Sequence, residues 1–234
     1  MSNILNPVEL TSALIKCRSI TPTSAGSIDL IISYLEPMGF TCTKIDFGQG
    51  DEKVENLYAR FGSLEPNICF AGHVDVVPTG DEQSWSIDPF GGEIKKGKIW
   101  GRGAADMKSG IAAFIAAVSE FMETNKNLKD YGSISFIITS DEEGKAINGT
   151  KKVVEWLINK SEKISGCLVG EPTNVNQMGD TIKIGRRGSF TGSLIVKGIQ
   201  GHVGYPDLAE NPINSLLKML EPFTKIHLDK GTNE

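Results

Sequence analysis

The stretch SISFIITSDEEGKA, residues 133–146, joins an apolar run to three adjacent carboxylates. Residues 133–139 are rich in Ile and Phe, which indicates a buried strand. Asp141, Glu142 and Glu143 follow its end, where like charges repel one another unless a positive charge lies among them. A helix start is the structural alternative, because acidic residues are favoured at the positive end of the helix dipole. The stretch alone leaves both interpretations open.

Strand-like and helix-like segments alternate along most of the chain. Residues 67–77 and 165–170 have the pattern of strands, and residues 109–125 have that of a buried helix. This alternation predicts an α/β fold, with a mostly parallel sheet and helices on both of its faces.

The pattern changes near Gly179. Two strand-like segments with a Gly-rich turn between them are followed by a helix-like segment at residues 211–223. We therefore expect two domains, residues 1–178 and residues 179–234, of which the second is the opening of a smaller α+β domain.

The composition excludes several classes of protein. The 234 residues include 24 basic and 29 acidic side chains, and a net charge of −5 argues against a nucleic-acid partner. The apolar run at residues 111–118 is too short to span a membrane, and the N-terminus lacks a signal-peptide pattern. The four cysteines show no CxxC spacing, which favours reduced thiols in a cytoplasmic protein over a thiolate metal site.

Metal-binding residue types follow the ends of three predicted strands. His73 ends the first apolar run, the acidic triplet follows the second, and Glu171 follows the third. Asp106 lies in a Gly-rich loop, WGRGAADMKSG, just before the buried helix. In open α/β sheets, ligands bind at the carboxyl ends of the strands. A histidine with several carboxylates and no thiolate suits zinc, with cobalt or manganese as substitutes.

The spacing within these motifs suggests a division of roles. His73 and Asp75 are two residues apart, so in an extended segment they project to one face, where Asp75 can hold the second imidazole nitrogen. Asp106 has two oxygens and could bridge two ions. Glu142 and Glu143 could divide metal binding and base catalysis. Each motif alone is more often structural, and it is their joint occurrence after successive strands that indicates a metal site.

Four motifs, GHVDVVPTGD, GRGAADMKSG, TSDEEG and GEPT, resemble the M20 metallopeptidase and deacylase family of dinuclear zinc hydrolases. The resemblance implies two zinc ions, for which cobalt can substitute. It makes His73 and Glu171 ligands of one zinc. Asp106 would bridge both ions, and Glu143 would bind the second.

The same resemblance implies further roles. Glu142 would be the general base, and Asp75 would orient His73. His202 would reach the active site of a partner subunit, since the second domain would be a lid that forms a homodimer. Arg186 would meet a substrate carboxylate, and Tyr205 would also contact the substrate.

Residues 170–206 narrow the expected substrate to a small acylated amino acid. They resemble family members that hydrolyse N-succinyl-LL-2,6-diaminopimelate in lysine synthesis. Another deacylase of the family, such as an acetylornithine deacetylase, or a carboxypeptidase is the first alternative. The second is a non-catalytic module that binds one metal ion.

One feature departs from the family pattern. The family has another histidine near its C-terminus that binds the second zinc, and His227 is a poor candidate for this role because it follows a helix. We therefore expect the chain to lack parts of both domains and one ligand of the second zinc.

Overall fold

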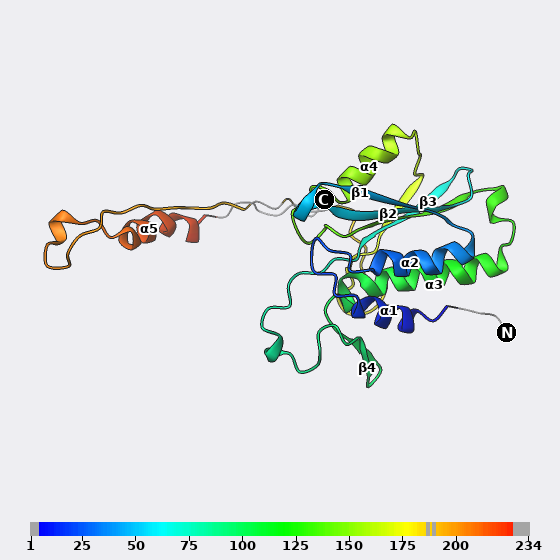
Figure 1. Ribbon diagram of the computed structural model, residues 1–234, viewed down its shortest axis with the longest axis horizontal. Coiled ribbons are helices and arrows are strands. Elements are labelled where there is room, and N and C mark those ends of the chain that lie inside the picture. The colour runs from blue at the N-terminus through cyan, green and yellow to red at the C-terminus, as the bar shows by residue number, and fades with distance from the viewer. Residues whose placement is uncertain (1–4, 186–187, 189–190, 227–234) are drawn as a thin grey trace. The chain divides into compact units, whose positions relative to one another are not determined.

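The computed structural model describes residues 5–185, 188 and 191–226 (Figure 1). The chain divides into two compact units, residues 1–182 and residues 183–234. Within the described residues, no helix is both long and apolar enough to cross a membrane.

The first unit contains a five-stranded sheet in the order β1-β2-β6-β3-β7. The strands span Thr41–Phe47 (β1), Val54–Phe61 (β2), Asn67–His73 (β3), Ser133–Thr139 (β6) and Gly166–Val169 (β7). Strands β6, β3 and β7 run parallel, whereas β1 pairs antiparallel with β2 and β2 antiparallel with β6. The prediction of a mostly parallel sheet is therefore only partly correct. The short connection between β1 and β2 permits an antiparallel hairpin, and a parallel pair would need a crossover of a dozen or more residues.

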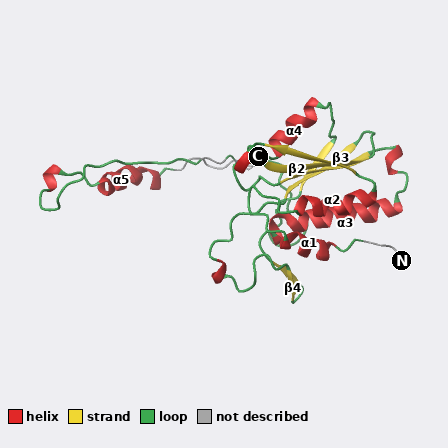
Figure 2. Cartoon of the chain, in the orientation of Figure 1, coloured by secondary structure: helices red, strands yellow, loops and turns green. Residues whose placement is uncertain are grey.

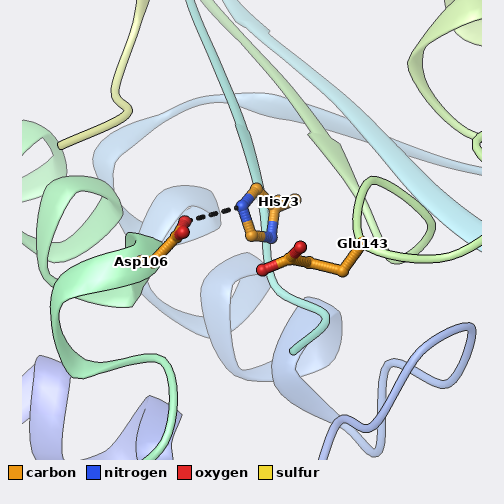
Figure 3. A group of neighbouring side chains, drawn as sticks. All are labelled: His73, Asp106 and Glu143. Carbon is orange, nitrogen blue, oxygen red and sulfur yellow. Dashed lines mark hydrogen bonds and ion pairs between the residues drawn. The ribbon is translucent and has the colours of Figure 1, made fainter. Parts of the chain in front are cut away.

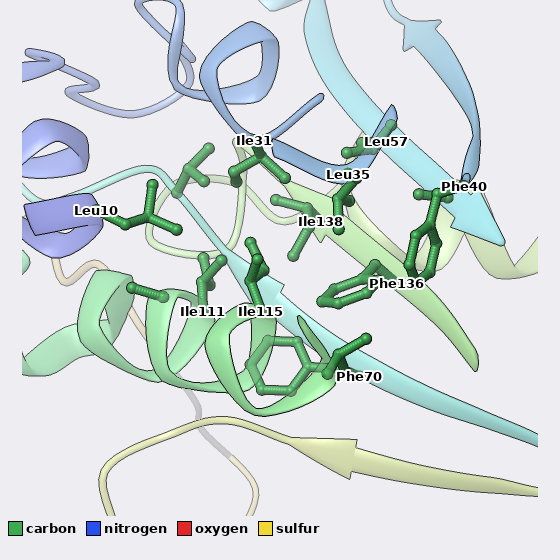
Figure 4. Close-up of a cluster of buried hydrophobic side chains, with 14 of the residues drawn as sticks. Leu10, Ile31, Leu35, Phe40, Leu57, Phe70, Ile111, Ile115, Phe136 and Ile138 are labelled. Atoms are coloured by element: carbon green, nitrogen blue, oxygen red, sulfur yellow. The ribbon is translucent and has the colours of Figure 1, made fainter. Parts of the chain in front are cut away.

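Helices cover both faces of this sheet, as predicted (Figures 1 and 2). They span Pro7–Lys16 (α1), Ser27–Leu35 (α2), Ser109–Thr124 (α3) and Thr150–Asn159 (α4). Helices α2 and α3 pack on one face, where Ile31 and Ile115 share a core with Phe70 and Phe136 of the sheet, and α1 packs against α3 and adds Leu10 to this core (Figure 4). Helix α4 packs on the other face through Val153 and Leu157, against Tyr58 and Ile137. Because strand side chains alternate, Phe136 and Ile137 of β6 serve opposite layers.

Local sequence determines where several elements begin and end. Asn6 caps α1 by accepting a hydrogen bond from the Val8 backbone N–H at 3.0 Å. Gly39, with φ of 89°, ends the turn that follows α2, a conformation that favours glycine. A small hairpin, β4 (Glu93–Lys95) and β5 (Lys98–Trp100), precedes the loop that carries Asp106.

The second unit contains the expected helix, α5 (Pro212–Leu220), capped by Asn211. The two strands expected before it are not formed by the described residues, and the regular pairing seen there is a single bridge between Ile199 and Glu210.

The segment after β6 is a loop held by a buried carboxylate. Asp141 is 4% exposed and accepts hydrogen bonds from the backbone N–H groups of Ala146, Ile147 and Asn148, at 3.1, 3.1 and 3.3 Å. No helix begins at the acidic triplet, since α4 starts only at Thr150. One of the three carboxylates therefore shapes the loop on which the other two lie.

We predict that Asp141→Ala lowers the free energy of unfolding by about 1–3 kcal/mol, because it removes the acceptor of three backbone donors. Thermal and urea denaturation measure this loss. Asp51→Ala is the matched control, because Asp51 is exposed and lies in the short 3-10 turn Gly50–Glu52. Equal stability of the two variants would show that Asp141 does not support the loop.

Candidate metal centre

His73, the last residue of β3, lies at the centre of a cluster of carboxylates. Its side chain is 1% exposed. Its Nε2 atom lies 3.1 Å from Oδ1 of Asp106, 3.5 Å from Oε1 of Glu171 and 4.0 Å from Oε2 of Glu142. Glu143 also points its carboxylate toward the imidazole, from the side opposite Asp106 (Figure 3). The structure therefore brings together the residues that the sequence predicts to bind metal.

Strand order explains this convergence. Strand β3 lies between β6 and β7, so the residues that follow these parallel strands flank His73. Asp106 comes from a kinked turn, Ala104–Lys108, that leads into α3. Two groups of donor atoms could each hold an ion, with all atoms in a group within 4.8 Å of one another. One group is His73, Asp106 and Glu143, and the other is His73, Glu142 and Glu171.

Asp75 orients this cluster in two ways. Its backbone carbonyl oxygen lies 2.9 Å from Nδ1 of His73, and its carboxylate lies farther away, at 3.6 Å. Donation from Nδ1–H to this carbonyl leaves the lone pair of Nε2 available for a metal. The Asp75 carboxylate accepts the backbone N–H groups of Glu142, at 3.1 Å, and Glu143, at 3.0 Å. Asp75 thus positions the acidic loop as well as the imidazole.

The charge distribution of the cluster suits a cation. Burial lowers the pKa of His73, but the hydrogen bonds and charge of Asp75, with the charge of Glu171, outweigh burial and raise it to about 9. Burial and the Asp106 charge raise the pKa of Glu143. Burial also raises the pKa of Glu171, although His73 opposes this. A divalent cation would relieve this repulsion, and one imidazole with several carboxylates is a donor set that zinc accepts.

A buried lysine, which sequence reasoning did not single out, anchors the turn that carries Asp106. Lys108 is fully buried, and its Nζ donates to the carbonyl oxygens of Leu14, at 2.9 Å, and Cys17, at 3.0 Å. Burial lowers the pKa of Lys108 to about 8. The turn is thereby tied to the C-terminal end of α1. A lysine in a Gly-rich loop carries no sequence signal for burial, because lysine is usually exposed.

Two further predicted site residues belong to the second unit. His202 and Tyr205 belong to the second unit, where their rings are 5.8 Å apart and both side chains are exposed. Arg186 and His227 lie outside the described residues.

Comparison with known proteins identifies relatives of this chain. It is 54% identical over 228 residues to a succinyl-diaminopimelate desuccinylase of Rhodospirillum centenum. This alignment covers 97% of this chain and 58% of that protein. A protein of the same name from Pelagibacter ubique is 52% identical over 98% of this chain and 59% of its own length. The chain therefore spans less than two thirds of the relatives that it matches.

A solved structure supports the fold. An M20 family metallo-carboxypeptidase of Sulfolobus solfataricus aligns with a TM-score of 0.63 and 19% identity, over 92% of this chain and 49% of that one. The sequence profile of peptidase family M20/M25/M40 matches residues 69–231, which include the whole His73 cluster. The chain belongs to peptidase family M20/M25/M40.

Proposed function

We propose that the protein containing this chain is a zinc-dependent amide hydrolase that converts N-succinyl-LL-2,6-diaminopimelate and water to succinate and LL-2,6-diaminopimelate. The observation that carries this proposal is the convergence of three carboxylates within 4.0 Å of Nε2 of His73, at the carboxyl edge of the sheet. The names of relatives at about 50% identity support the choice of substrate.

Four residues would hold the metal. His73 and Glu171 would bind one zinc ion, Asp106 would bridge to a second, and Glu143 would bind that second ion. Cobalt would substitute for zinc, because both accept nitrogen and oxygen ligands. When bound, the ions would supply Lewis-acid polarisation of the amide carbonyl and activate a water molecule.

Glu142 is the proposed general base. Its side chain is 39% exposed, and its backbone N–H donates a hydrogen bond to the Asp75 carboxylate. The glutamate carboxylate would take a proton from the attacking water and return it to the leaving amine nitrogen. General acid–base catalysis of this kind contributes about 10²–10⁴-fold to a rate.

The substrate carries several carboxylates, which suits an arginine. We propose that Arg186 binds one of them through its planar, two-pronged guanidinium. We also propose that residues 179–234 belong to a lid domain through which the protein forms a homodimer. His202 and Tyr205 would then contact the substrate from this lid, with His202 acting in the partner's active site. We also propose that the protein acts in the cytoplasm.

Zinc titration of the chain tests the metal centre. In the proposed assignment, three ligands (His73, Asp106 and Glu171) would serve the first ion and two (Asp106 and Glu143) would serve the second, so we expect one zinc to bind at much lower concentration than another. His73→Ala should weaken this tight site by more than about 100-fold, because it removes a ligand. His202→Ala, the matched control in the second unit, should leave it unchanged. Calorimetry that detects no tight zinc site in the wild-type chain would refute the proposal.

We predict that Glu142→Gln keeps the metal and loses about 10²–10⁴-fold in kcat, because the amide cannot accept the proton. The assay uses a protein of the relatives' full length that contains this chain, with metal content measured in parallel. Glu143→Gln is the comparison, and it should lose metal. If Glu142→Gln loses metal and keeps its rate, the two roles are reversed.

Substrate specificity distinguishes the proposed reaction from the other reactions of the family. The same protein should hydrolyse the succinylated diamine faster than N-acetylornithine. Arg186→Lys should lower kcat/KM for the succinylated substrate by about 10-fold or more without loss of metal, because lysine keeps the charge but not the two-pronged geometry. Equal losses on charged and uncharged acyl substrates would show that Arg186 has a structural role. No turnover of any substrate, with metal bound, would favour the non-catalytic module.

A further inference from the structure

Met107 follows Asp106 in the chain but lies on the other side of the backbone. Asp106 has φ of −121° and ψ of 97°, and Met107 has φ of −132° and ψ of 28°, so neither residue is helical within the turn. The Asp106 side chain is 52% exposed and its Oδ1 lies 3.1 Å from Nε2 of His73, whereas Met107 is fully buried.

The Met107 side chain contacts the ends of two of the three strands that lead to the cluster, β3 and β7. Its Sδ accepts the backbone N–H of His73 at 3.4 Å. A Cβ atom added to Gly72 would lie 2.5 Å from Cε of Met107, and one added to Gly170 would lie 2.8 Å from the same atom. Gly72 directly precedes His73, and Gly170 directly precedes Glu171. The methionine therefore lies against both glycines, in a space that it shares with Phe70, whose Cζ would lie 2.3 Å from a Cβ atom added to Gly170.

These contacts link three segments that carry candidate ligands. β3 ends in His73, β7 leads to Glu171, and the turn before α3 carries Asp106. A displacement of Met107 would move Asp106 through the backbone and would release the residues beside His73 and Glu171. Methionine suits such a space, since its unbranched thioether adapts to irregular gaps and accepts weak hydrogen bonds.

We propose that Met107 is a positioning residue of the metal centre, which fixes the relative positions of His73, Asp106 and Glu171 without touching the metal. This inference rests on the proposed metal site. It predicts that metal affinity and coordination geometry depend on the size and shape of residue 107. General core packing would affect only the stability of the fold.

The experiment compares Met107→Ala with Leu35→Ala in the 234-residue chain. Leu35 is equally buried and belongs to the same hydrophobic core, but it lies on α2, which carries no candidate ligand. Both variants should lower the melting temperature of the metal-free protein by similar amounts, since each removes a large apolar side chain. Met107→Ala should weaken zinc binding by about 10–100-fold, the range for residues that support metal ligands. Leu35→Ala should change zinc affinity by less than about twofold.

Two further measurements separate positioning from loss of stability. The visible absorption spectrum of the cobalt-loaded chain reports ligand geometry and should change in Met107→Ala but not in Leu35→Ala. Met107→Leu keeps most of the volume but loses the sulfur acceptor, and should give an intermediate zinc affinity. Gly72→Ala should weaken zinc binding less in the Met107→Ala background than in the wild type, because the added methyl would occupy the vacated space.

Each result has a defined meaning. Wild-type zinc affinity and an unchanged cobalt spectrum in Met107→Ala would overturn the positioning role and leave the metal centre intact. A wild-type chain that binds no zinc would overturn the metal centre, and this inference with it. If Met107→Ala does not fold, Met107→Leu and Gly72→Ala decide, and wild-type affinity in both would overturn the inference.

Discussion

Three carboxylates lie within 4.0 Å of a single imidazole nitrogen, and most features of the first unit serve to keep them there. Burial, with the charge of Asp106, raises the pKa values of Glu143 and Glu171, so the charged forms of these two carboxylates are disfavoured without a cation. The three carboxylates nearest to the imidazole come from three different segments, the turn before α3 and the segments that follow β6 and β7. This geometry therefore costs electrostatic energy, and it becomes favourable only when a positive charge binds among the carboxylates. A divalent cation supplies that charge more fully than the proton that His73 holds at its raised pKa of about 9.

Much of this arrangement could be predicted from the sequence because parallel strands share a direction. His73, Glu143 and Glu171 each follow an apolar run, and the carboxyl ends of parallel strands meet at one edge of a sheet. The prediction needs only the parallel part of the sheet, β6, β3 and β7, and is unaffected by the antiparallel pairing of β1 and β2. The antiparallel part of the sheet has no consequence for the site, since neither β1 nor β2 carries a candidate ligand.

The sequence could not predict contacts that depend on how deeply a side chain is buried or that are made by backbone atoms. The spacing of His73 and Asp75 predicts a contact, but the shortest approach uses the Asp75 carbonyl oxygen, and its carboxylate holds the loop instead. A carboxylate that accepts backbone N–H groups has no characteristic sequence pattern. The sequence also does not predict the space that Met107 occupies. This space depends on glycines at positions 72 and 170, which become neighbours only in the folded sheet. Residues that support a site are therefore harder to find than residues that form it.

Burial divides the acidic residues around the cluster into two groups. Asp75 and Asp141 are at most 4% exposed, and the oxygens of each accept backbone N–H groups. Such bonds occupy the lone pairs of the carboxylate oxygens, so a metal would have to displace them. The side chains of Asp106 and Glu142, in contrast, are 52% and 39% exposed. Buried aspartates can therefore shape the loops that place the more exposed carboxylates. The acidic triplet after β6 follows this rule, since its first residue holds the loop and the next two point toward His73.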